Sequence, residues 1–156
     1  MLLMPAPTGD ISERVLRDAF ALSVFGPFLL TGAIAPAMAE RGSGAIVNIG
    51  SNTGLRGSAG SAIYSATKAT IHSFTQSWAD EYGPHGVRVN AVAPGPIATE
   101  RRAEFSDHVV PMLARSPSRR MSTPDEVAGT VVFLASDDAA NIHGTILSVD
   151  GGWAAV

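Results

Sequence analysis

The chain has 156 residues and a net charge of -3, with 46% hydrophobic and only 16% charged residues. This length predicts one domain with a sizeable core, and the slightly acidic balance argues against a nucleic-acid partner. The absence of cysteine excludes disulfides and thiolate metal sites. The four histidines show no ligand-like spacing, so we expect them at the surface or at helix ends and expect no metal site. We find no signal peptide and no stretch as long as a membrane span, which favours a cytoplasmic protein without a membrane partner.

The first half of the chain predicts two long helices with a strand between them. Apolar residues recur at helical spacing over residues 10–40, and the Arg-Gly-Ser-Gly sequence at 41–44 ends that helix. Residues 45–49 are apolar and β-branched, which is typical of a buried parallel strand. A loop rich in glycine and serine follows at 50–60, and the second helix covers residues 62–82.

The second half continues the alternation of strands and helices. Residues 87–92 predict the second strand, and residues 145–149 predict the third. Between them, residues 97–121 predict a loop with one or two short helices. A helix then runs to about residue 136, because a capping threonine at Thr123 is followed by proline and by a glutamate in the capping-box position.

This order of elements predicts an α/β fold in which residues 1–156 form one domain. Strands separated by helices of this length form right-handed crossovers, which produce a doubly wound parallel sheet of about three strands. Ligands of such sheets bind beyond the carboxyl ends of the strands. Ser51 follows the first strand, Pro94 and Gly95 follow the second, and the helix that carries Tyr64 begins at the same edge.

Tyr64 and Lys68 form the most informative pair in the chain. The single lysine lies four residues after one of the two tyrosines, so a helix places the phenol and the ammonium on one face. A free phenol ionises near pH ~10, and a nearby positive charge favours the phenolate. The pair therefore predicts a proton-transfer site. The simpler alternative is a surface cation beside a packed tyrosine.

Four segments together resemble the short-chain dehydrogenase/reductase family, and most closely the 3-oxoacyl carrier-protein reductases and the sugar or polyol dehydrogenases. They are Ala-Ile-Val-Asn-Ile-Gly-Ser at 45–51, the Tyr-x-x-x-Lys at 64–68, Val-Arg-Val-Asn-Ala-Val-Ala-Pro-Gly-Pro-Ile-Ala-Thr at 87–99 and Leu-Ser-Val-Asp-Gly-Gly at 147–152. The resemblance covers nearly the whole chain. It implies a partial Rossmann-like catalytic domain that corresponds to the C-terminal half of the family's fold, with the N-terminal half missing.

The resemblance also implies a role for each matching residue. Tyr64 would be the general acid/base, Ser51 would hold the substrate carbonyl or hydroxyl, and Lys68 would favour the phenolate and hydrogen-bond the nicotinamide ribose. NAD or NADP would be the cofactor. Besides Tyr64 and Lys68, the residues expected to bind it are Pro94, Gly95, Ile97 and Thr99.

Two departures from the family pattern affect the expected activity. The glycine-rich phosphate turn and the residue that selects NAD or NADP have no counterpart in this sequence. Ser23 stands where the family often has a catalytic asparagine. We also expect the strand at 45–49 to leave a bare sheet edge, which a homo-oligomer or a complementing chain would cover.

Three hypotheses therefore stay open. The first is an oxidoreductase that moves hydride between NAD(P) and a small-molecule carbonyl or alcohol. The second is a cofactor-free relative that uses the same pocket for acid-base chemistry or ligand binding. The third is a non-catalytic truncated partner in an oligomer. We rank the enzyme first, because residues 45–99 keep every catalytic spacing that can be checked.

Overall fold

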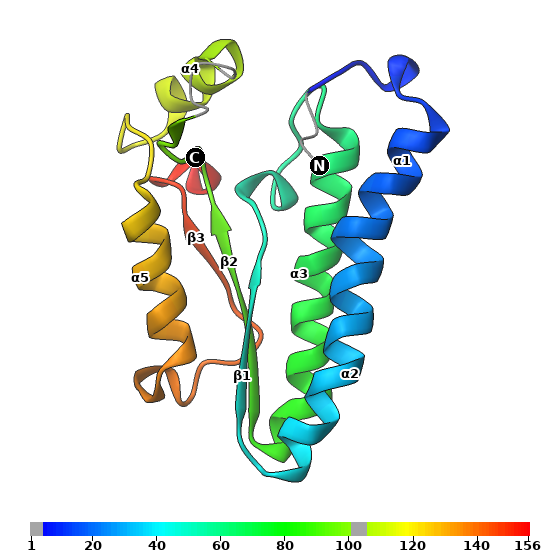
Figure 1. Ribbon diagram of the computed structural model, residues 1–156. Coiled ribbons are helices and arrows are strands. Elements are labelled where there is room, and N and C mark those ends of the chain that lie inside the picture. The colour runs from blue at the N-terminus through cyan, green and yellow to red at the C-terminus, as the bar shows by residue number, and fades with distance from the viewer. Residues whose placement is uncertain (1–4, 101–105) are drawn as a thin grey trace.

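The computed structural model describes residues 5–100 and 106–156 and has a parallel sheet at its centre (Figure 1). The sheet contains β1 (Gly44–Ile49), β2 (Val87–Pro94) and β3 (Ile146–Val149), in the order β1-β2-β3. β1 pairs with β2 from Gly44 opposite Val87 to Ile49 opposite Val92. β2 pairs with β3 from Ala91 opposite Ile146 to Pro94 opposite Val149. The expected doubly wound α/β fold is confirmed.

Helices cover both faces of this sheet (Figure 1). α1 (Glu13–Phe20), α2 (Gly26–Glu40) and α3 (Ala62–Tyr82) lie on one side, and α5 (Pro124–Ala135) lies on the other. α4 (Ser106–Arg115) lies beyond the carboxyl ends of the strands. The carboxyl end of the sheet is therefore bordered by α4, by the first turns of α3 and by the start of α1.

Two apolar clusters form the core because side chains alternate along β2. On one face, the buried residues Val87 and Val89 pack with Trp78 and Ala79 of α3. On the other face, Val92 joins a buried cluster that is completed from α5 and the segment after it by Val127, Leu134 and Ala139. The sheet is thus held from both sides, which fixes the positions of its strand ends.

Most predicted elements are found within a residue or two of their expected ends. The helix at 62–82 is confirmed at both ends, and the second strand extends to Pro94. The capping box is confirmed, because the Glu126 amide donates to Thr123 Oγ1 at 3.2 Å and Glu126 Oε2 accepts from the Thr123 amide at 2.8 Å. The expected short helix within 97–121 is α4, while residues 101–105 lie outside the described residues.

The expectation that no stretch is long enough to span a membrane is wrong. α1, a π-helical turn at Ala21–Phe25 and α2 form one continuous helix of 28 residues, whose most apolar window has a mean hydropathy of 1.7. Pro27 comes just after the π-helical turn, and the backbone stays helical through Phe25 and Gly26, so Pro27 does not end the helix. Helices in the core of globular domains can be equally long and apolar, so this helix is weak evidence for a membrane span.

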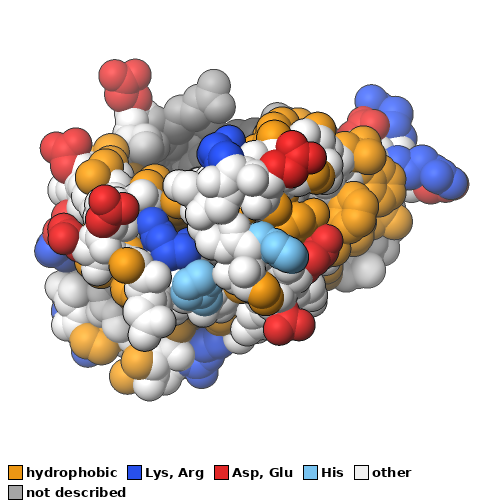
Figure 2. All heavy atoms as spheres, turned by 90° about the horizontal axis from the view of Figure 1, so that it is seen from below, with side chains coloured by type: hydrophobic (Ala, Val, Ile, Leu, Met, Phe, Trp, Pro, Cys, Tyr) orange, Lys and Arg blue, Asp and Glu red, His pale blue; other side chains and the backbone are white. Residues whose placement is uncertain are grey.

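The outer face of this helix is strongly apolar. Phe28 contacts the α3 aromatics Phe74 and Trp78, with ring centroids 5.3 and 6.1 Å away. Figure 2 shows hydrophobic side chains gathered toward its right, on the side where α2 and α3 cover the sheet. Five of the large side chains on this helix are between 51% and 70% exposed: Leu22, Phe25, Phe28, Leu29 and Leu30.

Candidate active site

Ser51 lies at the carboxyl end of β1, where the chain turns out of the sheet. The Gly50 amide donates to Val92 O at 2.8 Å, which continues the ladder one residue past β1. Ser51 then caps a short helical turn, η3 (Asn52–Gly54), and its Oγ accepts from the Thr53 amide at 3.3 Å. Ser51 is buried, so the turn holds its hydroxyl at the edge of the sheet rather than in bulk solvent.

Tyr64 and Lys68 lie on consecutive turns at the start of α3. Lys68 Nζ is 5.7 Å from the centroid of the Tyr64 ring and donates to Ile49 O at 2.8 Å. The ammonium is therefore tied to the end of β1, beside the Ser51 turn. Burial lowers the pKa of Lys68 from its ordinary value. This position differs from that of a surface cation, which was the simpler alternative for the pair.

Gly95 follows β2 at a point where the backbone of the next strand comes very close. Its amide donates to Val149 O at 3.0 Å, and a Cβ at this position would lie 2.9 Å from Asp150 Cα. The Asp150 carboxylate accepts from the amides of Gly152 and Ala154, each at 2.9 Å, and so closes a tight turn after β3. Glycine is required at residue 95 because no larger side chain fits against that turn.

The structure brings these residues together around one cavity of about 660 Å³. Ser51, Tyr64, Lys68 and Gly95 line it, and so does Ser23 from the π-helical turn.

Sequence reasoning missed a further wall of this cavity, which the N-terminal segment supplies. The amide of Ala6 donates to Gly60 O at 2.9 Å, which holds this segment across the loop before α3. The wall residues include Pro5, Ala6, Thr8, Ile11, Ser12 and Leu16.

Three of the residues expected to bind cofactor have side chains outside this cavity. Pro94 is buried as the last residue of β2, and Ile97 packs against the apolar cluster on the α5 side. Thr99 is exposed. None of the three lines the cavity, and their role in cofactor binding stays a prediction.

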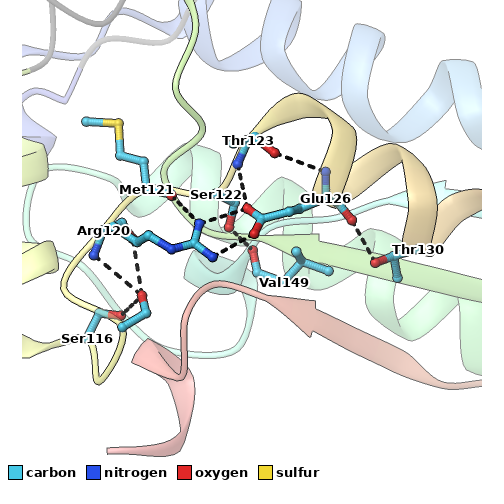
Figure 3. A network of polar contacts seen from close by, with 9 residues as sticks. Ser116, Arg120, Met121, Ser122, Thr123, Glu126, Thr130 and Val149 are labelled. Atoms are coloured by element: carbon cyan, nitrogen blue, oxygen red, sulfur yellow. Dashed lines mark hydrogen bonds and ion pairs between the residues drawn. The ribbon is translucent and has the colours of Figure 1, made fainter.

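A polar network holds the turn that follows Gly95 (Figure 3). Ser122 Oγ donates to Val149 O at 3.1 Å, and the Ser122 amide donates to Pro96 O at 3.0 Å. Arg120 then binds Glu126 through two contacts of 2.9 and 2.6 Å. The hydrogen bond from Arg120 lowers the pKa of Glu126 to about 2, with a further contribution from the Thr123 amide. The end of the 97–121 segment is thereby fixed against the end of β3, where Arg120, Ser122 and Glu126 line a second cavity of about 870 Å³.

The expectation that the histidines lie at the surface or at helix ends is wrong for His72. This residue is 6% exposed and lies one helical turn after Lys68 on α3, beneath the Ser51 turn. The spacing Tyr64-Lys68-His72 in the sequence was a signal for its position, because it places all three residues along one helical stripe.

Two features of this cavity could hold the nicotinamide end of a dinucleotide. Lys68 supplies a donor, and the cavity has both hydroxyl and apolar walls. Neither G-x-x-x-G-x-G nor G-x-G-x-x-G, the glycine motifs that would hold the pyrophosphate at a helix start, occurs in the 156 residues. Among the described residues, no group of three His, Asp or Glu side chains could hold a metal ion.

Comparison with known proteins identifies the family. The family model described as enoyl-(acyl carrier protein) reductase matches residues 3–154. A 3-oxoacyl-[acyl-carrier-protein] reductase of Synechocystis is 46% identical over 132 residues, which are 84% of this chain and 53% of that protein.

Two solved structures have the same fold over almost the whole chain. A short chain dehydrogenase/reductase family protein is 40% identical with a TM-score of 0.92, over 99% of this chain and 64% of its own. ElxO with NADP bound is 29% identical with a TM-score of 0.92, over 99% of this chain and 64% of its own. The chain thus spans less than two thirds of the length of these proteins. With the matched model, the shared fold and the sequence motifs in agreement, the chain belongs to the short-chain dehydrogenase/reductase family.

Proposed function

We propose that the protein is an NAD(P)-dependent oxidoreductase that acts on a small-molecule carbonyl or alcohol. The observation that carries this proposal is the convergence of Ser51, Tyr64, Lys68 and Gly95 on one cavity, although they come from three separate segments. A solved relative with NADP bound supports the choice of cofactor class.

Tyr64 performs the proton transfer in this proposal. In the reducing direction, its hydroxyl donates a proton to the carbonyl oxygen of the substrate and leaves a phenolate. In the oxidising direction, the phenolate removes the proton of the alcohol. Ser51 donates a hydrogen bond from Oγ to the same oxygen, which stabilises the negative charge that develops there.

Lys68 supports both the proton transfer and the binding of the cofactor. Its ammonium lies 5.7 Å from the centroid of the Tyr64 ring, close to the group that exchanges the proton. Lys68 Nζ and the backbone at Pro94 and Gly95 would hold the nicotinamide riboside end. When bound, NAD(P) supplies or accepts the hydride at the carbon of the reacting group. The choice between NAD and NADP stays open, because the family residue that selects between them has no counterpart in this sequence.

Turnover by Tyr64→Phe tests the proposal. Oxidation of NADH and NADPH would be followed with a 3-oxoacyl thioester and with a panel of small ketones, and reduction of the oxidised forms with sugar alcohols. Loss of the phenol should lower kcat by about 10²–10⁴-fold, the usual range for a general acid/base. Tyr82→Phe is the matched control, because it removes the other tyrosine hydroxyl at the far end of α3. Equal turnover by wild type and Tyr64→Phe would contradict the assigned role.

The apolar outer face of α2 supports a proposal about assembly. Monomeric proteins rarely leave several large apolar side chains exposed side by side, and Leu29 and Leu30 are 70% and 61% exposed. We propose that a homo-oligomer or a complementing chain covers this face. Oxidoreductases that act on small metabolites with NAD(P) work where that cofactor is present, so we expect a cytoplasmic location.

A further inference from the structure

His72 is a buried titratable residue to which the proposed reaction gives no role. It follows Lys68 by four residues on α3, as Lys68 follows Tyr64, so one stripe of the helix carries a phenol, an ammonium and an imidazole in series. The first two residues line the cavity, and the third lies beneath it, against the turn that carries Ser51. Only 6% of His72 is exposed.

Two glycines of the Ser51 turn pack directly on the imidazole ring. A Cβ on Gly50 would overlap Nε2 and would lie 2.7 Å from Cδ2, and it would also approach Val92 O at 3.3 Å. A Cβ on Gly54 would lie 2.7 Å from Cε1. The turn therefore wraps around the ring from Gly50 to Gly54, and the position of the ring determines the path of the backbone on both sides of Ser51.

The imidazole ring also accepts a hydrogen bond from the backbone of Ser51. The Ser51 amide donates to His72 Nε2 in a long contact of 3.5 Å. A nitrogen that accepts a hydrogen bond carries no proton, so the neutral ring has its proton on Nδ1. His72 Nδ1 is buried without a hydrogen-bond partner among the described residues.

We propose that neutral His72 is a positioning residue that sets the orientation of the Ser51 turn and, through it, of the Ser51 hydroxyl. The proposal rests on the proposed function, in which that hydroxyl holds the substrate oxygen. Protonation of Nε2 would place two N–H donors face to face and push the Ser51 amide away. The hydrogen bond from the Ser51 amide to His72 is therefore present only while His72 is uncharged.

The surroundings of His72 favour its neutral form. Burial lowers the pKa of His72 below its ordinary value of 6.5, a hydrogen bond with the Gly54 backbone raises it in part, and the charge of Lys68 lowers it further. Lys68, on the same helix, is the one charged group found to act on the ring among the described residues. The residues of the Ser51 turn that pack on the ring, Gly50 and Gly54, carry no charge.

NMR of the ¹⁵N-labelled chain tests this proposal without substrate. Long-range ¹H–¹⁵N spectra report the tautomer and the pH midpoint of titration of each imidazole. The set of signals that is lost in His72→Gln belongs to His72. We expect the Nδ1–H tautomer, a midpoint below 6.5, and a Ser51 amide signal that shifts with the same midpoint. An Nε2–H tautomer, or a Ser51 amide that does not follow the ring, would overturn the proposal.

Kinetics of two variants then separate positioning from packing. Glutamine can offer Oε1 as an acceptor near the position of Nε2, whereas leucine fills the space without an acceptor. His72→Leu should lower kcat by about 10–100-fold with an unchanged KM for NAD(P)H, since small misplacements of a reacting group are costly. His72→Gln should restore kcat to within about threefold of wild type and remove the decline of kcat at acidic pH. Equal losses in both variants would assign His72 to packing alone. Absence of cofactor binding or turnover in wild type would contradict the proposed function and leave the NMR result to decide the role of His72.

Discussion

Replacement of Gly50 by alanine should destabilise the fold through one identifiable clash. The added Cβ would overlap Nε2 of His72 and lie 2.7 Å from Cδ2, well inside normal contact distance. Gly54 packs on the neighbouring Cε1 and limits movement of the ring, and Val92 O, 3.3 Å from the new Cβ, limits movement of the backbone at Gly50. Overpacking of this kind costs about 1–3 kcal/mol, and loss of the Ser51 hydrogen bond adds about 1 kcal/mol. We therefore expect the free energy of unfolding to fall by about 2–4 kcal/mol.

A double-mutant cycle identifies His72 as the cause of that loss. His72→Ala alone should cost about 1–3 kcal/mol, because it empties a buried site. In Gly50→Ala/His72→Ala the new methyl group enters the vacated space, so the combined loss should be smaller than the sum by about 1–3 kcal/mol. Urea unfolding at one fixed protein concentration, followed by circular dichroism, measures all four proteins.

Gly57→Ala is the matched control for this cycle. Gly57 lies in the same loop, its backbone is not left-handed and nothing lies within 4 Å of an added Cβ, so its stability should stay within about 0.5 kcal/mol of wild type. Two results would refute the steric explanation: a Gly50→Ala variant as stable as Gly57→Ala, or losses in the double variant that simply add.

Three further predictions concern the core, the pH dependence and the assembly. Leu134→Ala should lower the free energy of unfolding by about 3–5 kcal/mol in urea, because Leu134 is fully buried; a loss below about 1 kcal/mol would contradict its core position. Because the pKa of His72 is lowered in the folded state, the unfolded chain takes up more protons as the pH falls below 6.5. Wild-type stability should therefore be fully present above that pH and decline as the pH falls through the folded pKa, and His72→Gln should flatten the decline measured by urea unfolding at each pH. Leu29→Glu should reduce the mass observed by sedimentation at micromolar concentration, whereas Val110→Glu, also at an exposed apolar residue, should not; a wild-type monomer would contradict the proposed assembly.

The sequence could predict the core of the site because its geometry follows from local periodicity. Tyr64 and Lys68 share a face of any helix that contains both. Ser51 and Gly95 follow strands whose carboxyl ends must meet at one edge of a parallel sheet. The structure confirms both expectations, with Lys68 Nζ bonded to Ile49 O at the end of β1.

The features that sequence reasoning missed depend on contacts between distant segments. His72 is buried because the Ser51 turn folds over its face of α3, which the periodicity of α3 alone does not specify. The N-terminal wall of the cavity depends on the bond from the Ala6 amide to Gly60 O, across more than fifty residues of chain. The helix over residues 10–40 was expected and is found as α1, the π-helical turn and α2. The sequence reasoning missed that these 28 residues include a window apolar enough to span a membrane.

The most direct test of the proposed active site is a titration of NADH and NADPH into the purified chain, followed by nicotinamide fluorescence. Lys68→Ala removes the residue assigned to the nicotinamide ribose, and Arg41→Ala removes an exposed cation at the end of α2 as the control. We expect saturable binding of at least one cofactor by wild type and by Arg41→Ala, and its loss in Lys68→Ala. A folded wild-type chain that binds neither cofactor, or binding that survives in Lys68→Ala, would contradict the proposed site.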